Sequence, residues 1–397
     1  MSERVRRALQ DVALPDEDGA AERAWAVVER AHDRREPIRW THRHRGPLVA
    51  LVAAGAIVVA ALTPPGMAVV DRFRDAVGRE PSKPGLVGLP AEGRLLVLSP
   101  GGPWVVQEDG SKRLLGDYAG ATWSPRGLFV VATKGRQLVA LDAESGDPRW
   151  SLSRTEPISD PRWGGVGLDT RIAYRAGDTL HVVAGDGSPD AIIAQGVAPV
   201  APAWKPDSYV LAYADARGRI HVVDADTHRQ LWQTGALKGV RELAFSGNRL
   251  VVSTSSRVVV FQKGKATPFL RVPAGHVLLD TVLLSFGGVL YADYDPGADS
   301  TGLLRSDCTV AGACALMPDT RVFEGPGRIT NLIASPDLAW VTAGWPAADQ
   351  FLFFRVQRLG KVRAVSNVTA EFSPGGGAAA FPVIAGWAPP AAEAGSS

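Results

Sequence analysis

The sequence is poor in cysteine, in net charge and in recognisable catalytic motifs. Only two cysteines occur among 397 residues, which excludes a disulfide-rich scaffold and a four-cysteine zinc site. Lysine plus arginine is 43 and aspartate plus glutamate is 41, so the net charge is only +2 and no basic excess points to nucleic acid as a partner. The chain has no G-x-x-x-x-G-K-[ST], H-E-x-x-H, G-x-S-x-G or C-x-x-C motif. We therefore expect no cofactor, no metal site, no catalytic residues and no enzyme activity.

What the sequence does contain is ample apolar material and many turns. Hydrophobic residues make up 46% of the chain, which makes global disorder improbable. The 43 glycines and 29 prolines follow no collagen-like period, and they indicate many tight turns. The chain divides into segments of contrasting composition.

Residues 1–46 are polar and carry charges of both signs. Ala21, Trp25 and Val28 recur at near-helical spacing and give a narrow apolar stripe. Such a stripe cannot bury itself in so short a segment. One interpretation is a mostly disordered tail with nascent helix, and the other is a segment that folds on a cytoplasmic partner, with Trp25 and Val28 as its contacts.

Residues 47–70 contain no charged side chain and predict a transmembrane helix. Arginines at 34, 35, 39, 43 and 45 precede this run, so the positive-inside rule places the N-terminus in the cytoplasm and the rest of the chain outside the plasma membrane. The alternative of a cleaved signal peptide requires an abnormally long leading region, and no Ala-x-Ala site follows. Residues 71–85 predict a short amphipathic stretch and a proline-containing linker.

Residues 86–387 form a repeat array, which is the most informative feature of the chain. Aromatic residues recur at positions 123, 163, 204, 245 and 286, with spacings of 40 or 41 residues. Each is followed by short runs rich in β-branched and aromatic residues, bounded by glycine, aspartate and serine. A period near 40 with several strands per repeat is typical of a β-propeller, whose blades have four strands. The expected repeat anchors are Trp123, Trp163, Trp204, Phe245, Phe286 and Phe372, together with Trp150 and Trp232.

The count of repeats predicts seven blades in an all-β domain, although six or eight also fit. The first repeat lacks an initial strand, and we expect the segment Val368–Phe372 to supply it and close the ring. Residues 378–383 then predict an extra strand without an assigned place. We expect residues 388–397 to be a disordered tail.

Two kinds of known repeat are similar to these sequences. Trp123-Ser-Pro125 and Asp160-Pro-Arg-Trp163 resemble WD40- and TolB-type propeller repeats. The segments 141–150 and 223–232 resemble quinoprotein (PQQ-type) repeats, in which an Asp-x-x-(Thr/Ser)-Gly turn precedes a tryptophan. The whole arrangement is similar to a group of membrane-anchored propellers of actinobacteria. The resemblance implies the fold and is almost silent on activity.

Two sets of residues invite a functional as well as a structural interpretation. The tryptophans are candidates for an aromatic ligand cage, but their structural period favours packing between blades. Cys308 and Cys314 have five residues between them on an inserted loop, and an extracytoplasmic domain permits a disulfide there. The other interpretation of this pair is two free, buried thiols.

Three functions remain open at this stage. The first is a membrane-anchored, extracytoplasmic module that binds a protein or envelope ligand at its loops. The second is a transmembrane sensor, similar to an anti-sigma factor, whose tail holds a cytoplasmic partner, although the His-x-x-x-Cys-x-x-Cys zinc motif of such factors is absent. The third is an enzyme whose catalytic set comes from separate blades.

Overall fold

The computed structural model describes residues 88–284, 288–306, 319–356, 362–373 and 380–390. No helix in these ranges is long and apolar enough to cross a membrane. The predicted span at 47–70, the tail at 1–46 and the linker at 71–85 lie outside the described residues.

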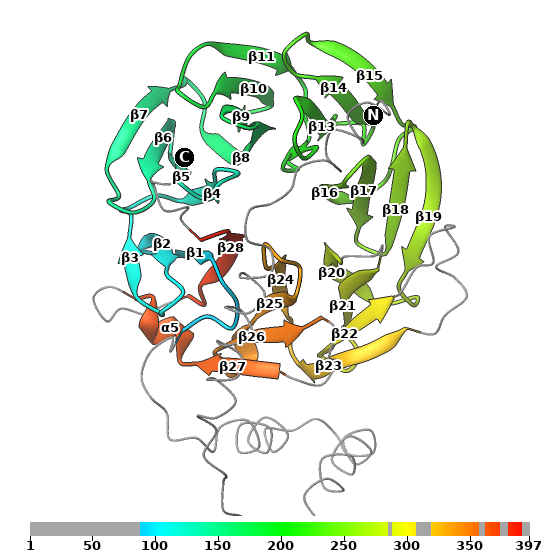
Figure 1. Cartoon of the computed structure of the whole chain (residues 1–397). Coiled ribbons are helices and arrows are strands. Elements are labelled where there is room, and N and C mark those ends of the chain that lie inside the picture. The colour runs from blue at the N-terminus through cyan, green and yellow to red at the C-terminus, as the bar shows by residue number, and fades with distance from the viewer. Residues whose placement is uncertain (1–87, 285–287, 307–318, 357–361, 374–379, 391–397) are drawn as a thin grey trace, which may run out of the picture. The chain divides into compact units, whose positions relative to one another are not determined.

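The described residues form seven four-stranded antiparallel sheets that stand around a common axis as the blades of a propeller (Figure 1). Blade 1 contains β28 (Val383–Ala388), β1 (Arg94–Ser99), β2 (Gly102–Val106) and β3 (Lys112–Leu114). Blade 2 contains β4 (Gly120–Trp123), β5 (Phe129–Lys134), β6 (Gln137–Asp142) and β7 (Pro148–Ser153). Blade 3 contains β8 (Ile158–Val166), β9 (Asp169–Ala176), β10 (Thr179–Ala184) and β11 (Asp190–Ala194).

The remaining blades repeat this order. Blade 4 contains β12 (Ala203–Trp204), β13 (Val210–Ala214), β14 (Ile220–Asp224) and β15 (Arg229–Gln233). Blade 5 contains β16 (Val240–Ser246), β17 (Arg249–Thr254), β18 (Arg257–Gln262) and β19 (Lys265–Arg271). Blade 6 contains β20 (Val277–Leu283), β21 (Val289–Asp295), β22 (Ser300–Ser306) and β23 (Thr320–Pro326). Blade 7 contains β24 (Thr330–Ala334), β25 (Trp340–Trp345), β26 (Gln350–Arg355) and β27 (Val362–Ser366), with the short helices η3 (Pro346–Ala348) and α5 (Val368–Glu371). The all-β, seven-bladed propeller predicted from the repeat is confirmed.

The hydrophobic core lies between neighbouring blades. The two middle strands of a blade are apolar along their length, so both of their faces are buried, as in β5 and β6. Side chains of blade 2, such as Val131 and Leu138, pack in one cluster with Ile172 and Tyr174 of blade 3. The outermost strand alternates between partly buried and exposed residues, as β7 does. Each blade is therefore stabilised by its neighbours.

The innermost strands all run in the same direction, because every blade has the same strand order. They are β28, β4, β8, β12, β16, β20 and β24 (Figure 1). We call the end of the ring where these strands begin, formed by the loops that link successive blades, the top face. The opposite end is the bottom face. Leu89 donates its backbone N–H to the Glu108 carbonyl at the β2–β3 turn, so the described chain enters the ring at the bottom face.

The closure of the ring differs from the prediction. The innermost strand of blade 1 is β28, which pairs with β1, whereas Val368–Glu371 forms the helix α5. Asn367 has a positive φ of 61° and Asp349 accepts hydrogen bonds from the backbone and the hydroxyl of Thr369, so a helical turn replaces the expected strand. The closing strand β28 begins at Val383, the last residue of the segment 378–383 that had no assigned place. This strand ends at Ala388, one residue into the predicted tail.

Gly164 of β8 is expected to tolerate no larger residue. A Cβ atom at this position clashes with the Trp204 ring of blade 4. The variant Gly164→Ala should lower the free energy of unfolding by about 1–3 kcal/mol, because the blades must move apart. Thermal unfolding of full-length protein in detergent measures the loss. Gly235→Ala is the matched control, since nothing lies within 4 Å of its Cβ; equal melting of the two variants contradicts this packing.

Candidate functional site

Three charged side chains from three different blades lie near the axis. Arg162 belongs to β8, Glu242 to β16 and Asp280 to β20. Charge interactions couple Arg162 with Glu242, and Glu242 with Asp280. Blade 4 stands between the first two residues, and its innermost strand β12 has only two residues. Arg162 and Glu242 therefore influence each other across the inside of the ring. We call these three residues the axial site.

Backbone irregularities position all three residues in the same way. The pairing register shifts between Ser159 and Arg162 in β8, between Val240 and Glu242 in β16, and between Leu278 and Asp280 in β20. Each charged residue is thus the first one paired after its bulge. A β-bulge bends the strand and redirects side chains, and such bulges are common beside functional sites.

Backbone donors hold Asp280 in place. Its two carboxylate oxygens accept the N–H of Thr281 at 2.7 Å and the N–H of Leu332 from β24 at 2.8 Å. The Thr281 hydroxyl lies 3.3 Å from Oε2 of Glu242 and 2.9 Å from the hydroxyl of Ser253. Asp280 therefore joins blade 6 to blade 7, and Thr281 joins Asp280 to Glu242.

The two carboxyl groups have raised pKa values. Burial raises the pKa of Glu242 to about 8, and the neighbouring charge of Asp280 adds to this effect. Burial also raises the pKa of Asp280, to about 6, but hydrogen bonds from backbone N–H groups of Leu332, Thr281 and Asn331 oppose the rise. The pair therefore retains a proton near neutral pH, and that proton resides on Glu242 because backbone hydrogen bonds stabilise the Asp280 anion.

Arg162 has no carboxylate within ion-pair distance in the described part of the chain. In the same part of the chain, its side chain forms one hydrogen bond, from Nη1 to the carbonyl oxygen of Pro161 at 2.9 Å. The nearby Asp160 is occupied instead by Arg175, whose Nε lies 2.9 Å from Oδ2. The Arg162 side chain is accessible to solvent, yet protein surrounds it closely enough that burial lowers its pKa. Such a combination is expected for a side chain that lines the inside of a ring.

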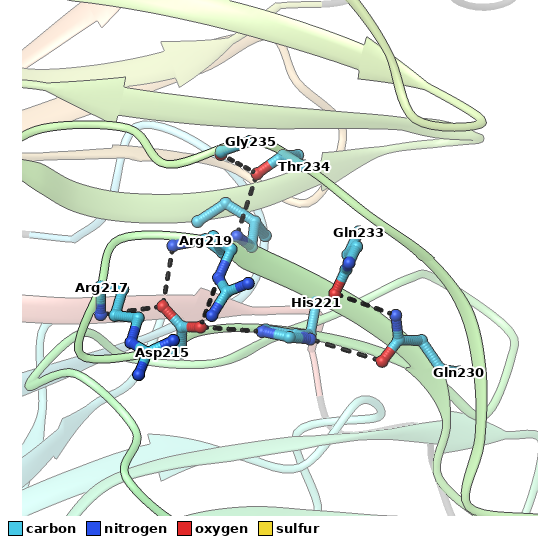
Figure 2. Close-up of polar contacts among 9 residues, drawn as sticks. Asp215, Arg217, Arg219, His221, Gln230, Gln233, Thr234 and Gly235 are labelled. Atoms are coloured by element: carbon cyan, nitrogen blue, oxygen red, sulfur yellow. Dashed lines mark hydrogen bonds and ion pairs between the residues drawn. The ribbon is translucent and has the colours of Figure 1, made fainter.

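A second polar network lies on the top face, at the β13–β14 turn of blade 4 (Figure 2). Asp215 accepts the backbone N–H groups of Arg217 and Arg219 at 2.9 Å, the Nε of Arg219 at 3.1 Å and the Nε2 of His221 at 3.1 Å. These hydrogen bonds outweigh burial and lower the pKa of Asp215 to about 2. All the partners belong to one hairpin, so this network stabilises a turn.

His181 and His221 lie at equivalent positions of blades 3 and 4, but they do not form a paired site. His181 stacks on Tyr174 within blade 3, and His221 stacks on Tyr213 within blade 4, both with ring centroids 5.1 Å apart. Each pair lies on the second and third strands of its own blade, away from the axis. Among the described residues, no group of three histidine, cysteine or acidic side chains is placed to hold a metal ion.

The predicted anchors that the structure describes lie at contacts between blades. Trp150 of blade 2 donates its indole N–H to Gly185 of blade 3, and Trp204 of blade 4 donates to the carbonyl of Arg162, both at 2.9 Å. Other predicted anchors lie against aromatic or charged side chains: Trp163 on Phe129, Trp232 on Phe261 and Trp123 under Arg94. Phe245 of blade 5 packs against the apolar cluster that blades 4 and 5 share. In this region the structure forms no aromatic cage around an open space.

Phe372 is buried but is not on an innermost strand. It follows α5 and packs on Trp104 and Phe351, with ring centroids 5.8 and 5.9 Å away. Phe372 therefore packs between blades 1 and 7, but it follows a helix where the prediction expected an innermost strand. Phe286, Cys308, Cys314, Trp25 and Val28 lie outside the described residues.

Sequence reasoning missed the axial site. Arg162, Glu242 and Asp280 were not selected, although each lies one to six residues before an aromatic anchor of the repeat. The available signal was a charged residue inside an innermost strand, where the repeat otherwise places apolar or small residues.

Comparison with known proteins identifies the fold and no more. No family model and no curated protein matches the sequence. Among solved structures, Hsv2p from Kluyveromyces lactis is similar with a TM-score of 0.51 and 13% identity, over 66% of this chain and 89% of that chain. A Bacteroides uniformis protein named for a suspected 6-phosphogluconolactonase activity has a TM-score of 0.50 and 16% identity, over 69% of this chain and 95% of that chain. At such low identity, these similarities show that the chain contains a β-propeller.

Proposed function

We propose that this protein is a membrane-anchored β-propeller that binds a partner or ligand at its top face and does not catalyse a reaction. The observation that carries the proposal is the axial site. Three charged residues from three blades approach the axis, and the Arg162 guanidinium forms no ion pair with any residue that the structure describes. Without an ion pair, the Arg162 guanidinium has no evident role in stabilising the blades. The free-energy cost of holding a charge near the axis is understandable if a ligand completes the site.

The proposed anchoring rests on the sequence. The uncharged run at 47–70 and its basic upstream flank are the features of a single-pass helix with a cytoplasmic N-terminus. The described chain enters the ring at the bottom face. This arrangement is that of the membrane-anchored WD40/TolB-like group. We expect its partner to be a protein or another component of the envelope.

In-cell crosslinking with mass spectrometry tests this proposal. Arg136 and Lys238 are exposed on top-face loops, whereas Arg126 and Lys265 are exposed at the bottom face. The double variant Arg136→Glu/Lys238→Glu should lose crosslinked envelope partners that the wild type captures, because a reversed charge opposes the native partner. The matched variant Arg126→Glu/Lys265→Glu should keep them.

The opposite results have a clear meaning. Equal loss in both variants, or full retention in the top-face variant, overturns binding at the top face. A chain that lacks residues 1–36 tests the alternative of a transmembrane sensor. It loses the tail but keeps the basic flank and the apolar run that set the expected membrane topology. Cytoplasmic partners that disappear with this deletion favour a tail that signals.

A further inference from the structure

We propose that the axial site binds a compact oxyanion, a carboxylate or phosphate group of the ligand, between the guanidinium of Arg162 and the carboxyl group of Glu242. The inference rests on the proposed function, since it names the ligand chemistry of the same site. Two observations beyond the presence of charges lead to it.

The first observation is the state of Arg162. Its guanidinium has five N–H donors, and in the described part of the chain one of them is used, on the carbonyl of the adjacent Pro161. The carboxylate that would otherwise neutralise it, Asp160, is bound to Arg175. A solvent-accessible guanidinium that lines the inside of the ring without a carboxylate partner is suited to planar anions, which it binds through two parallel hydrogen bonds.

The second observation is the division of roles between the two carboxyl groups. Asp280 is held by backbone N–H groups on both oxygens, which stabilise its charge. Burial, together with that fixed charge, raises the pKa of Glu242, so Glu242 keeps its proton and is a hydrogen-bond donor at neutral pH. A ligand anion can accept that proton in a hydrogen bond, whereas an ionised Glu242 would repel it.

The charge balance of the surroundings favours the same sign of ligand. Besides Glu242 and Asp280, the charged groups that act on the axial site are Arg162 on β8, Arg241 beside Glu242 on β16, and Asp160, which forms an ion pair with Arg175. Arg241 also donates to the carbonyl of Leu278 at 3.2 Å, which keeps it close to β20. While Glu242 is protonated, two guanidinium groups oppose one carboxylate. A cationic ligand would meet an excess of positive charge.

Calorimetric titration of the full-length chain in detergent micelles tests the inference, with succinate and sulfate as probes. Sulfate is fully ionised and succinate is predominantly the dianion at pH 6.5 and at pH 9, so a loss of affinity at pH 9 belongs to the protein. We expect saturable binding of at least one probe at pH 6.5, and binding about 10-fold or more weaker at pH 9, where Glu242 loses its proton. Binding of succinate alone identifies a carboxylate ligand, and binding of sulfate alone identifies a phosphate-like ligand.

Three variants make the test specific. Arg162→Gln should weaken binding about 10- to 100-fold, whereas the exposed Arg126→Gln should bind as the wild type does. Glu242→Gln should still bind, because its amide N–H₂ donates, but its affinity should no longer change between pH 6.5 and 9. If Arg162→Gln fails to fold, Arg162→Lys keeps the charge, loses the paired donors and should still weaken binding.

The inference is overturned if neither probe binds at pH 6.5, if Arg162→Gln and Arg126→Gln bind with the same affinity, or if Glu242→Gln keeps the pH dependence of the wild type. Its failure is separable from that of the proposed function. Crosslinked partners that depend on Arg136 and Lys238 support binding at the top face even when no anion binds.

Discussion

Truncation of the chain after Pro382 is expected to unfold the whole ring. The change removes β28, the innermost strand of blade 1, which pairs only with β1 and lies between β24 and β4. Ile384 and Trp387 are buried, and Trp387 packs edge-on against Phe353 of blade 7 with ring centroids 5.9 Å apart. Loss of two such side chains costs about 5–10 kcal/mol, comparable to the total stability of a typical domain.

The measurement is thermal unfolding followed by circular dichroism, together with limited proteolysis. A chain that ends at Pro390 retains β28 and is the matched control. We expect a cooperative transition for the control and none for the truncated chain. The point variant Ile384→Asp should lower the melting temperature without shortening the chain, because it places an unpaired charge in the core. A cooperative transition of the truncated chain near that of the control contradicts closure by β28.

The error over closure shows what a repeat motif can and cannot predict. In two blades a Ser-Pro motif follows the innermost strand, and the serine hydroxyl accepts the N–H of the residue five positions later: Ser124 from Phe129 and Ser335 from Trp340. Phe372-Ser373-Pro374 has the same letters, but the Ser373 hydroxyl donates to the Thr369 carbonyl at the end of α5. The motif describes a local turn. Whether a strand precedes it depends on the pairing partner, which no local pattern contains.

The repeat period predicted the fold because each blade depends on the same packing. Trp163 stacks on Phe129 of blade 2 and Trp204 donates to the Arg162 carbonyl of blade 3, so a residue needed at one junction is needed again 41 residues later. The axial residues follow the same period, with separations of 80 and 38 residues, but they share no residue type, and each is the first residue paired after a bulge. One-residue register shifts cannot be read from apolar alternation, so the sequence did not show that these charges converge.

Stability is expected to fall as pH rises from about 5 to 9, and Glu242→Gln should remove much of this loss. Glu242 and Asp280 have pKa values of about 8 and about 6 in the folded protein, above their ordinary values of 4.5 and 3.8. The folded state thus binds protons more tightly than the unfolded chain over this range. Their favourable contribution is complete below the unfolded values, decreases as each group ionises and is lost above about pH 8.

Glutamine reproduces the neutral, hydrogen-bonding form of Glu242 at every pH. Because the solvent-accessible interior screens the charge, we expect the variant to be more stable than wild type at pH 9 by about 1–3 kcal/mol, with little difference at pH 5. Urea unfolding at pH 5, 7 and 9 measures both. Equal pH profiles of the variant and the wild type would show that Glu242 ionises as freely in the ring as in the unfolded chain.

Asp215 supplies a control of opposite sign. Four hydrogen bonds lower its pKa to about 2, so its contribution is present above the unfolded value of 3.8 and is lost as pH falls toward 2 (Figure 2). Asp215→Asn should therefore reduce stability at pH 7 and at pH 9 alike, and reduce it less at pH 3. Since Asp215 lies in a surface turn and Glu242 near the axis, opposite responses of the two variants would assign the alkaline loss to the axial site, whereas a common response would assign it to the net charge of the ring.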